Sequence, residues 1–149
     1  MLDLIIKNGS CYIDKDLKDQ DIAIKDGKII KIGEIDNEAK EVFDAKGLTV
    51  LPGCIDTQTH FREPGSTDTE DLHSGSRAAI VGGITSVFEM PNTNPPTSTK
   101  VEFQKKLDLA KNRMYCNYAF YFGATADNAN ELADLVNLEG CCGIKLFAG

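Results

Sequence analysis

The sequence predicts an α/β protein in which a small antiparallel β unit precedes repeated β/α units. Over residues 1–50, short β-type runs alternate with turn dipeptides such as Asn8-Gly9 and Asp26-Gly27, which are hairpin signals. From residue 51 onward, apolar strand-like segments alternate with segments of helical spacing. This alternation favours parallel strands joined by right-handed crossovers. We therefore expect a β unit over residues 1–50, the N-terminal part of a β-sandwich, and four β/α units over residues 51–149.

The β/α part is predicted element by element. A strand at 55–61 leads into a polar loop, and the helical spacing over 71–81 ends at Gly82-Gly83. The later elements are a strand at 84–90, a Pro-rich loop at 91–96, a helix at 101–114, a strand at 115–123, a helix at 128–138 and a strand at 142–147. Four units fit either an open sheet or half of an eight-stranded barrel. Because the last strand has no covering helix, we expect the polypeptide to be truncated.

Composition excludes several classes of protein. The 149 residues include 16 basic and 23 acidic side chains, a net charge of −7, which argues against nucleic acid or an anionic membrane as the main partner. No apolar run approaches the ~18 residues that a membrane span needs, and the N-terminus does not resemble a signal peptide. The five cysteines form no C-x-x-C pair, so we expect small, mostly buried free thiols in a cytoplasmic protein.

The first strand of the β/α part carries the most informative polar residues. Asp56, Gln58 and His60 are spaced two apart, so a regular strand places them on one face. Polar groups on a buried strand are costly unless they bind something, and at the C-terminal end of a barrel strand that partner is usually a ligand or a metal. A histidine satisfied by its neighbours in the interior is the structural alternative, and spacing alone does not separate the two.

Three further features lie at the same ends of successive strands. Arg62 follows the first strand, where its guanidinium is suited to binding a carboxylate. Asn92 lies in the Pro-rich loop after the second strand, and Lys145 lies among apolar neighbours in the fourth strand. A buried lysine must lose its charge, pair with an acid or be modified. Taken singly, an exposed arginine, a structural turn and a lysine that reaches solvent explain these residues equally well.

The combination resembles a known family. The chain is similar, over its whole length, to the N-terminal third of a dihydroorotase, a member of the metal-dependent amidohydrolases. The most specific motifs are H-F-R-E-P-G and M-P-N-T. The matching residues are those at 52–56, 60–65, 70–75, 82–85, 90–95 and 143–147. Hydantoinases and allantoinases are related families that resemble these two motifs less closely.

This resemblance implies a composite fold of a β-sandwich and a (β/α)₈ barrel, of which the chain would hold the first half. It also implies the reversible cyclisation of N-carbamoyl-aspartate to dihydroorotate in pyrimidine synthesis, with Zn²⁺ lowering the pKa of a bound water. By position, His60 resembles a metal ligand, Arg62 and Asn92 resemble groups that hold the substrate carboxylate, and Lys145 matches a lysine that many members carbamylate. The general-base aspartate and the remaining metal histidines are expected beyond residue 149.

The sequence departs from the family pattern at Gln58. The motif is normally Asp-x-His-x-His, and an amide oxygen is a poor zinc ligand beside imidazole. We therefore expect the more buried metal to be held weakly, held by other groups, or absent. The second histidine of the chain, His73, falls on the first helix, where a solvated or packing position is expected. The 149-residue chain alone is accordingly predicted to be inactive.

Two alternatives to a dihydroorotase remain open at this point. One is a hydantoinase- or allantoinase-like hydrolase of cyclic amides. The other is a catalytically inactive homologue that assembles with aspartate transcarbamoylase, which Gln58 keeps open. The expected partners are a small-molecule substrate and either a second copy of the chain or that transcarbamoylase.

Overall fold

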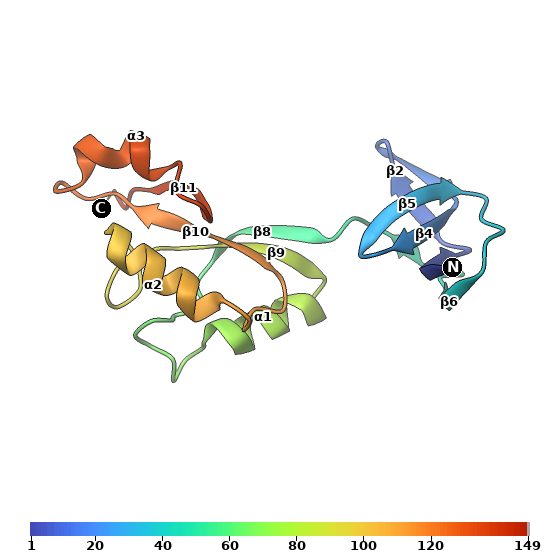
Figure 1. Cartoon of the computed structure of the whole chain (residues 1–149), viewed down its shortest axis with the longest axis horizontal. Coiled ribbons are helices and arrows are strands. Elements are labelled where there is room, and N and C mark those ends of the chain that lie inside the picture. Colours follow the sequence, from blue (N-terminus) through green and yellow to red (C-terminus); the bar gives the residue numbers. More distant parts are fainter. Residues whose placement is uncertain (149) are drawn as a thin grey trace. The chain divides into compact units, whose positions relative to one another are not determined.

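The computed structural model describes residues 1–148 and divides the chain into two compact units, Met1–Pro52 and Gly53–Gly149. Figure 1 shows strands alone in the first unit and strands alternating with helices in the second. No helix among the described residues is long and apolar enough to cross a membrane. All five cysteines are free, and of these Cys11 and Cys116 are buried whereas Cys54 is exposed.

The first unit consists of two small sheets. Its strands are β1 (Leu2–Lys7), β2 (Ser10–Ile13), β3 (Asp16–Asp19), β4 (Asp21–Lys25), β5 (Lys28–Gly33), β6 (Ala39–Asp44) and β7 (Thr49–Val50). One sheet has the order β5-β4-β1-β6 and the other has the order β3-β2-β7. The hairpin predicted at Asp26-Gly27 is confirmed: both residues have positive φ, as a tight turn between β4 and β5 requires.

The prediction of a purely antiparallel unit is wrong for two strand pairs. β1 pairs with β6 in parallel, and β2 pairs with β7 in parallel. The connection at 34–38 places Ile35 in the core with Leu2, Ile5 and Ala23, and β6 then runs beside β1 in the same direction. Alternating hydrophobicity predicts a half-buried strand but not the direction of its neighbour, and no hairpin signal lies between β5 and β6.

The second unit is a four-stranded parallel sheet. Its strands are β8 (Cys54–Thr59), β9 (Ile84–Glu89), β10 (Asn117–Gly123) and β11 (Cys141–Lys145), in the order β11-β10-β9-β8. Each strand therefore lies beside the next one in the chain. A doubly wound sheet would instead reverse its strand order part-way. The sequential order matches a partial barrel, and its four C-terminal strand ends lie along one edge.

The helices connect these strands and cover the sheet. α1 (Leu72–Val81) and α2 (Lys100–Ala110) lie on the same side of the sheet and contact each other (Figure 1). Asp71 caps α1 and Thr99 caps α2, each accepting a backbone N–H of the first turn. The helix predicted at 128–138 is confirmed in part: residues 129–135 are helical, as a 3₁₀ turn, Ala129–Glu131, followed by a four-residue α3, Leu132–Leu135. Asn128 fixes this segment by donating to the carbonyls of Ser98 and Gly123.

The core of the second unit lies between the sheet and the helices. Its buried residues are Phe61, Leu72, Val87, Phe103, Ala110, Cys116, Phe120, Phe122 and Leu135. Phe61 lies directly after β8 and packs against α1 at Gly75. A Cβ atom added at Gly75 would lie 2.4 Å from the Phe61 ring, so no larger residue fits there without moving the ring. Packing at this point sets the path of the chain just beyond His60.

We therefore predict that Gly75→Val lowers the free energy of unfolding of the second unit by about 1–3 kcal/mol, since it overfills a packed site. The control is Gly82→Ala, at the end of α1, where the nearest atom to an added Cβ is 3.5 Å away. Urea denaturation measures both changes. Equal stability of Gly75→Val and Gly82→Ala would contradict the packing described here.

Candidate active site

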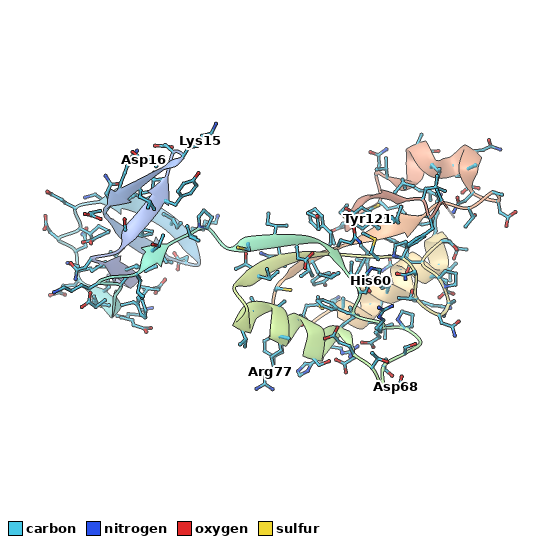
Figure 2. The ribbon with its side chains drawn as sticks, turned by 180° about the vertical axis from the view of Figure 1, so that it is seen from behind. Lys15, Asp16, His60, Asp68, Arg77 and Tyr121 are labelled. Carbon is cyan, nitrogen blue, oxygen red and sulfur yellow. The ribbon has the colours of Figure 1, made fainter. Side chains whose placement is uncertain are left out.

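The end of β8 places the first candidate residues. His60 is half-buried where β8 runs into the following loop (Figure 2), and the Gln58 side chain is exposed. The Asp56 carboxylate accepts the backbone N–H of Gln58 at 2.9 Å. The register of β8 against β9 shifts between Asp56 and Thr59, so strict alternation does not hold here. Period two alone therefore does not place Asp56, Gln58 and His60 on one face.

His60 is held by a residue of the neighbouring loop. Its Nδ1 atom lies 2.9 Å from the side-chain oxygen of Asn92, which follows β9. An amide oxygen can only accept a hydrogen bond, so Nδ1 carries the proton when the imidazole is neutral. The Nε2 atom then keeps its lone pair. This is the form in which a histidine binds a metal ion or accepts a proton.

The two loops that follow β8 and β9 are joined by their backbones. The amide of Met90 donates to the carbonyl of Thr59, and the amide of Asn94 donates to the carbonyl of Pro64, both at 2.9 Å. Gly65 has a φ of +118°, and a Cβ atom there would lie 2.7 Å from Asn94. Only glycine allows this close approach. The loops that carry His60 and Asn92 therefore behave as one layer of structure.

Arg62 lies in this layer with an exposed side chain. Its φ of +63° falls in the left-handed region, which a residue other than glycine adopts only when its neighbours hold it there. Glu63 supplies that hold, because it pairs with both terminal nitrogens of Arg113 (2.7 and 3.1 Å) and accepts the backbone N–H of Leu72 (2.9 Å). The Arg62 guanidinium forms no hydrogen bond or ion pair with residues 1–148, which leaves it available to a ligand.

Lys145 and His60 lie at the ends of the two outer strands of the sheet, β11 and β8. Lys145 ends β11, and its ammonium lies 5.1 Å from the centre of the Phe147 ring. Three strand spacings of about 4.8 Å separate the two edges of a flat sheet, roughly 14 Å. The Lys145 side chain is half-buried in this chain and not fully buried as expected. β11 is an edge strand here, so one of its sides has no neighbour to cover it.

His73 lies apart from these loops, on α1. Its ring packs edge-on against Tyr115, whose hydroxyl lies 3.3 Å from the Nε2 atom of His73. This exposed position agrees with the packing role expected from the sequence.

The structure also contains a buried ion pair that sequence reasoning missed. Glu89, the last residue of β9, pairs with Lys106 of α2, and both side chains are almost fully buried. The Lys106 ammonium also donates to the carbonyl of Met90 at 3.0 Å. In the sequence, Lys106 has the helical spacing of the core-facing residues Phe103 and Ala110, and this spacing could have predicted a buried lysine. Its partner is 17 positions away in the sequence, so spacing could not identify it.

Burial governs the ionisation of this pair. Burial raises the pKa of Glu89 to about 7, although the Lys106 ammonium, the Phe61 backbone N–H and the nearby Arg62 all favour the ionised form. Burial also lowers the pKa of Lys106, against the attraction of Glu89. Neither carboxylate oxygen of Glu89 has a hydrogen-bond partner of ordinary geometry among residues 1–148, so the contact with Lys106 is its main compensation.

These residues do not form a complete metal site by themselves. Among the described residues, no three side chains of histidine, cysteine, aspartate or glutamate lie close enough together to hold an ion. The donors at the strand ends are the Nε2 atom of His60, the amide oxygen of Gln58 and, at the end of the outer strand β11, the amine of Lys145. Zinc sites in proteins normally use three or four nitrogen, sulfur or carboxylate ligands. The chain therefore offers at most part of a donor set.

Comparison with known proteins gives one consistent family. The sequence model described as "Amidohydrolase family" matches residues 49–140. Allantoinases of Escherichia coli are 42% identical over 146 residues, which is 97% of this chain and 32% of the relative. The chain thus spans about a third of the length of these relatives.

Solved structures agree with this assignment. The L-hydantoinase (dihydropyrimidinase) of Arthrobacter aurescens matches with a TM-score of 0.87 and 33% identity, covering 97% of this chain and 32% of that one. The D-hydantoinase of a Thermus species matches with a TM-score of 0.72 and 28% identity, covering 89% and 31%. The superfamily expected from the sequence is confirmed. These relatives favour the hydantoinase and allantoinase alternative over a dihydroorotase.

The pKa of Glu89 predicts a pH dependence of stability. A carboxyl group with a raised pKa in the folded state favours folding fully below its ordinary value of 4.5, and this contribution is lost as the pH rises to about 7. We expect a loss on the order of 1–3 kcal/mol over that interval. Glu89→Gln should remove this slope, whereas the surface variant Glu139→Gln should keep it. Urea denaturation between pH 4.5 and 8 measures the slope, and an unchanged slope in Glu89→Gln would exclude Glu89 as its source.

Proposed function

Because this chain belongs to the amidohydrolase family, we propose that the protein containing it hydrolyses a ring amide of the allantoin or hydantoin class. The observation that carries this proposal is the His60–Asn92 contact at the ends of two adjacent parallel strands. The identity to allantoinases over nearly the whole chain supports the substrate class. Allantoin and hydantoin are five-membered rings whose amide carbonyls need an electrophile and a positioned nucleophile for hydrolysis.

The residues of this chain supply part of that arrangement. His60 presents the lone pair of Nε2, and Asn92 fixes the orientation of the imidazole. Arg62 offers a charged, unengaged donor to a carbonyl or carboxylate oxygen of the substrate. Amidohydrolases are typically metal-dependent. Since the donors here are incomplete, we propose that the remaining ligands and the general base belong to a longer protein of which this chain is about a third.

A dihydroorotase is the second candidate, and Arg62 favours it. A free guanidinium beside the site is suited to a ring carboxylate, which dihydroorotate has and hydantoin lacks. The two candidates differ in what Arg62 contributes. It should be essential for a substrate with a ring carboxylate and of smaller effect for a neutral ring.

A chimeric enzyme tests both candidates. This chain replaces the 146-residue segment of Escherichia coli allantoinase that it matches, and turnover of allantoin, hydantoin and dihydroorotate is measured. We expect turnover of a neutral ring, and a loss of less than about tenfold in kcat/KM for Arg62→Ala, since a neutral ring makes no ion pair. Turnover of dihydroorotate alone, abolished by Arg62→Ala, would favour the second candidate. A folded chimera that hydrolyses none of the three would contradict the proposal.

Gln58 gives a separate test that needs no substrate. Gln58→His replaces a weak amide donor by an imidazole at the same strand end as His60, so we expect the chain to bind Zn²⁺ more tightly, by about 10-fold or more. The matched control is Gln104→His on the exposed face of α2, which has no histidine neighbour. Competition with a chromophoric chelator measures the affinity. No difference between the two variants would support a non-catalytic assembly role, with a second copy or a transcarbamoylase as the partner.

A further inference from the structure

The Glu89–Lys106 pair lies between the sheet and α2, directly beneath the candidate site. The Lys106 side chain is 0% exposed and that of Glu89 is 1% exposed. The Lys106 ammonium lies 5.1 Å from the centre of the Phe120 ring, so it is surrounded by core side chains. Two ionisable side chains are thus enclosed among apolar ones.

Stability alone does not account for this arrangement. Replacing a buried ion pair by apolar residues of similar volume is often neutral or stabilising, because desolvation offsets the attraction between the charges. A methionine at position 106 would fill the same space. What it could not supply is a directional donor to the backbone.

That donor has a defined target. Lys106 binds the carbonyl of Met90, and the amide of the same residue binds the carbonyl of Thr59. Met90 is therefore fixed through both of its backbone polar groups. Two residues further on, Asn92 contacts the Nδ1 atom of His60. The short path from Met90 to Asn92 runs through Pro91, whose ring restricts the backbone.

We propose that Lys106 is a positioning residue, which holds Asn92 against His60 and thereby fixes the imidazole with its proton on Nδ1. Lys106 does not touch the site; it acts through the carbonyl of Met90. The importance of this role for catalysis rests on the proposed function. The positioning itself does not, because it is measured without a substrate or a metal.

Histidine side-chain NMR on the metal-free chain tests the proposal. The chain contains only two histidines, so His73 serves as an internal reference in every spectrum. In the wild-type chain at a pH where the ring is neutral, we expect His60 to show the Nδ1–H tautomer. In Lys106→Met, His60 should shift toward the Nε2–H tautomer while the signals of His73 stay unchanged. The matched control is Lys105→Met, whose side chain is 63% exposed and which should leave both histidines unchanged.

A second variant covers the case in which Lys106→Met fails to fold, since that change leaves Glu89 buried beside no cation. Glu89→Gln combined with Lys106→Met removes both charges and still lacks the donor to Met90. It should fold and should show the same shift at His60. Three results would each overturn the proposal: an Nε2–H tautomer in the wild-type chain, an unchanged His60 in a folded variant without Lys106, or an equal shift in Lys105→Met. The wild-type measurement can overturn the proposal even where both variants are unfolded.

Discussion

Backbone hydrogen bonds between the loops after β8 and β9 are the constraint on which the candidate site depends. Loops at a sheet edge have polar backbone groups that the sheet no longer satisfies, and each needs a partner. Here Thr59 pairs with Met90, and Pro64 pairs with Asn94. These contacts bring His60 and Asn92 within hydrogen-bond distance. In the same layer, Glu63 holds the Arg62 backbone in the left-handed region, and the Arg62 side chain stays exposed.

Two ion pairs support these loops from the side of α2. Lys106 pairs with Glu89 at the end of β9 and donates to the carbonyl of Met90 in the second loop. Arg113, just after α2, pairs with Glu63 in the first loop. Both supporting residues therefore come from one helix and the turn that follows it. Such a scaffold places functional groups on loops while the precision comes from rigid elements beneath them. The chemistry that these loops can perform is set by the side chains that the scaffold leaves unengaged.

The sequence predicted the parts of this arrangement that depend on local signals. Alternating strand and helix patterns predicted the parallel sheet of the second unit, and Asp26-Gly27 predicted the β4–β5 hairpin of the first unit. The polar residues at successive strand ends predicted that His60 and Asn92 lie at the same end of the sheet, and the structure brings them into contact.

The Glu89–Lys106 pair could not be predicted, because it joins a strand and a helix by tertiary packing. The partial exposure of Lys145 was also missed, since it depends on whether another strand covers β11. The motifs H-F-R-E-P-G and M-P-N-T favoured a dihydroorotase, whereas identity over nearly the whole chain favours allantoinases and hydantoinases. Two short motifs are a weak guide to substrate choice within a family that shares its framework.

Amide hydrogen exchange of the 149-residue chain tests whether the two loops form one pre-ordered layer. The critical amides are those of Met90 and Asn94, which donate to Thr59 and Pro64. We expect both to exchange as slowly as core amides of β9 and far more slowly than the exposed turn at Lys15, because they open only when the second unit unfolds. Exchange of Met90 and Asn94 as fast as that of Lys15 would show that the loops open independently. In that case the His60–Asn92 contact would not be a fixed feature of the site.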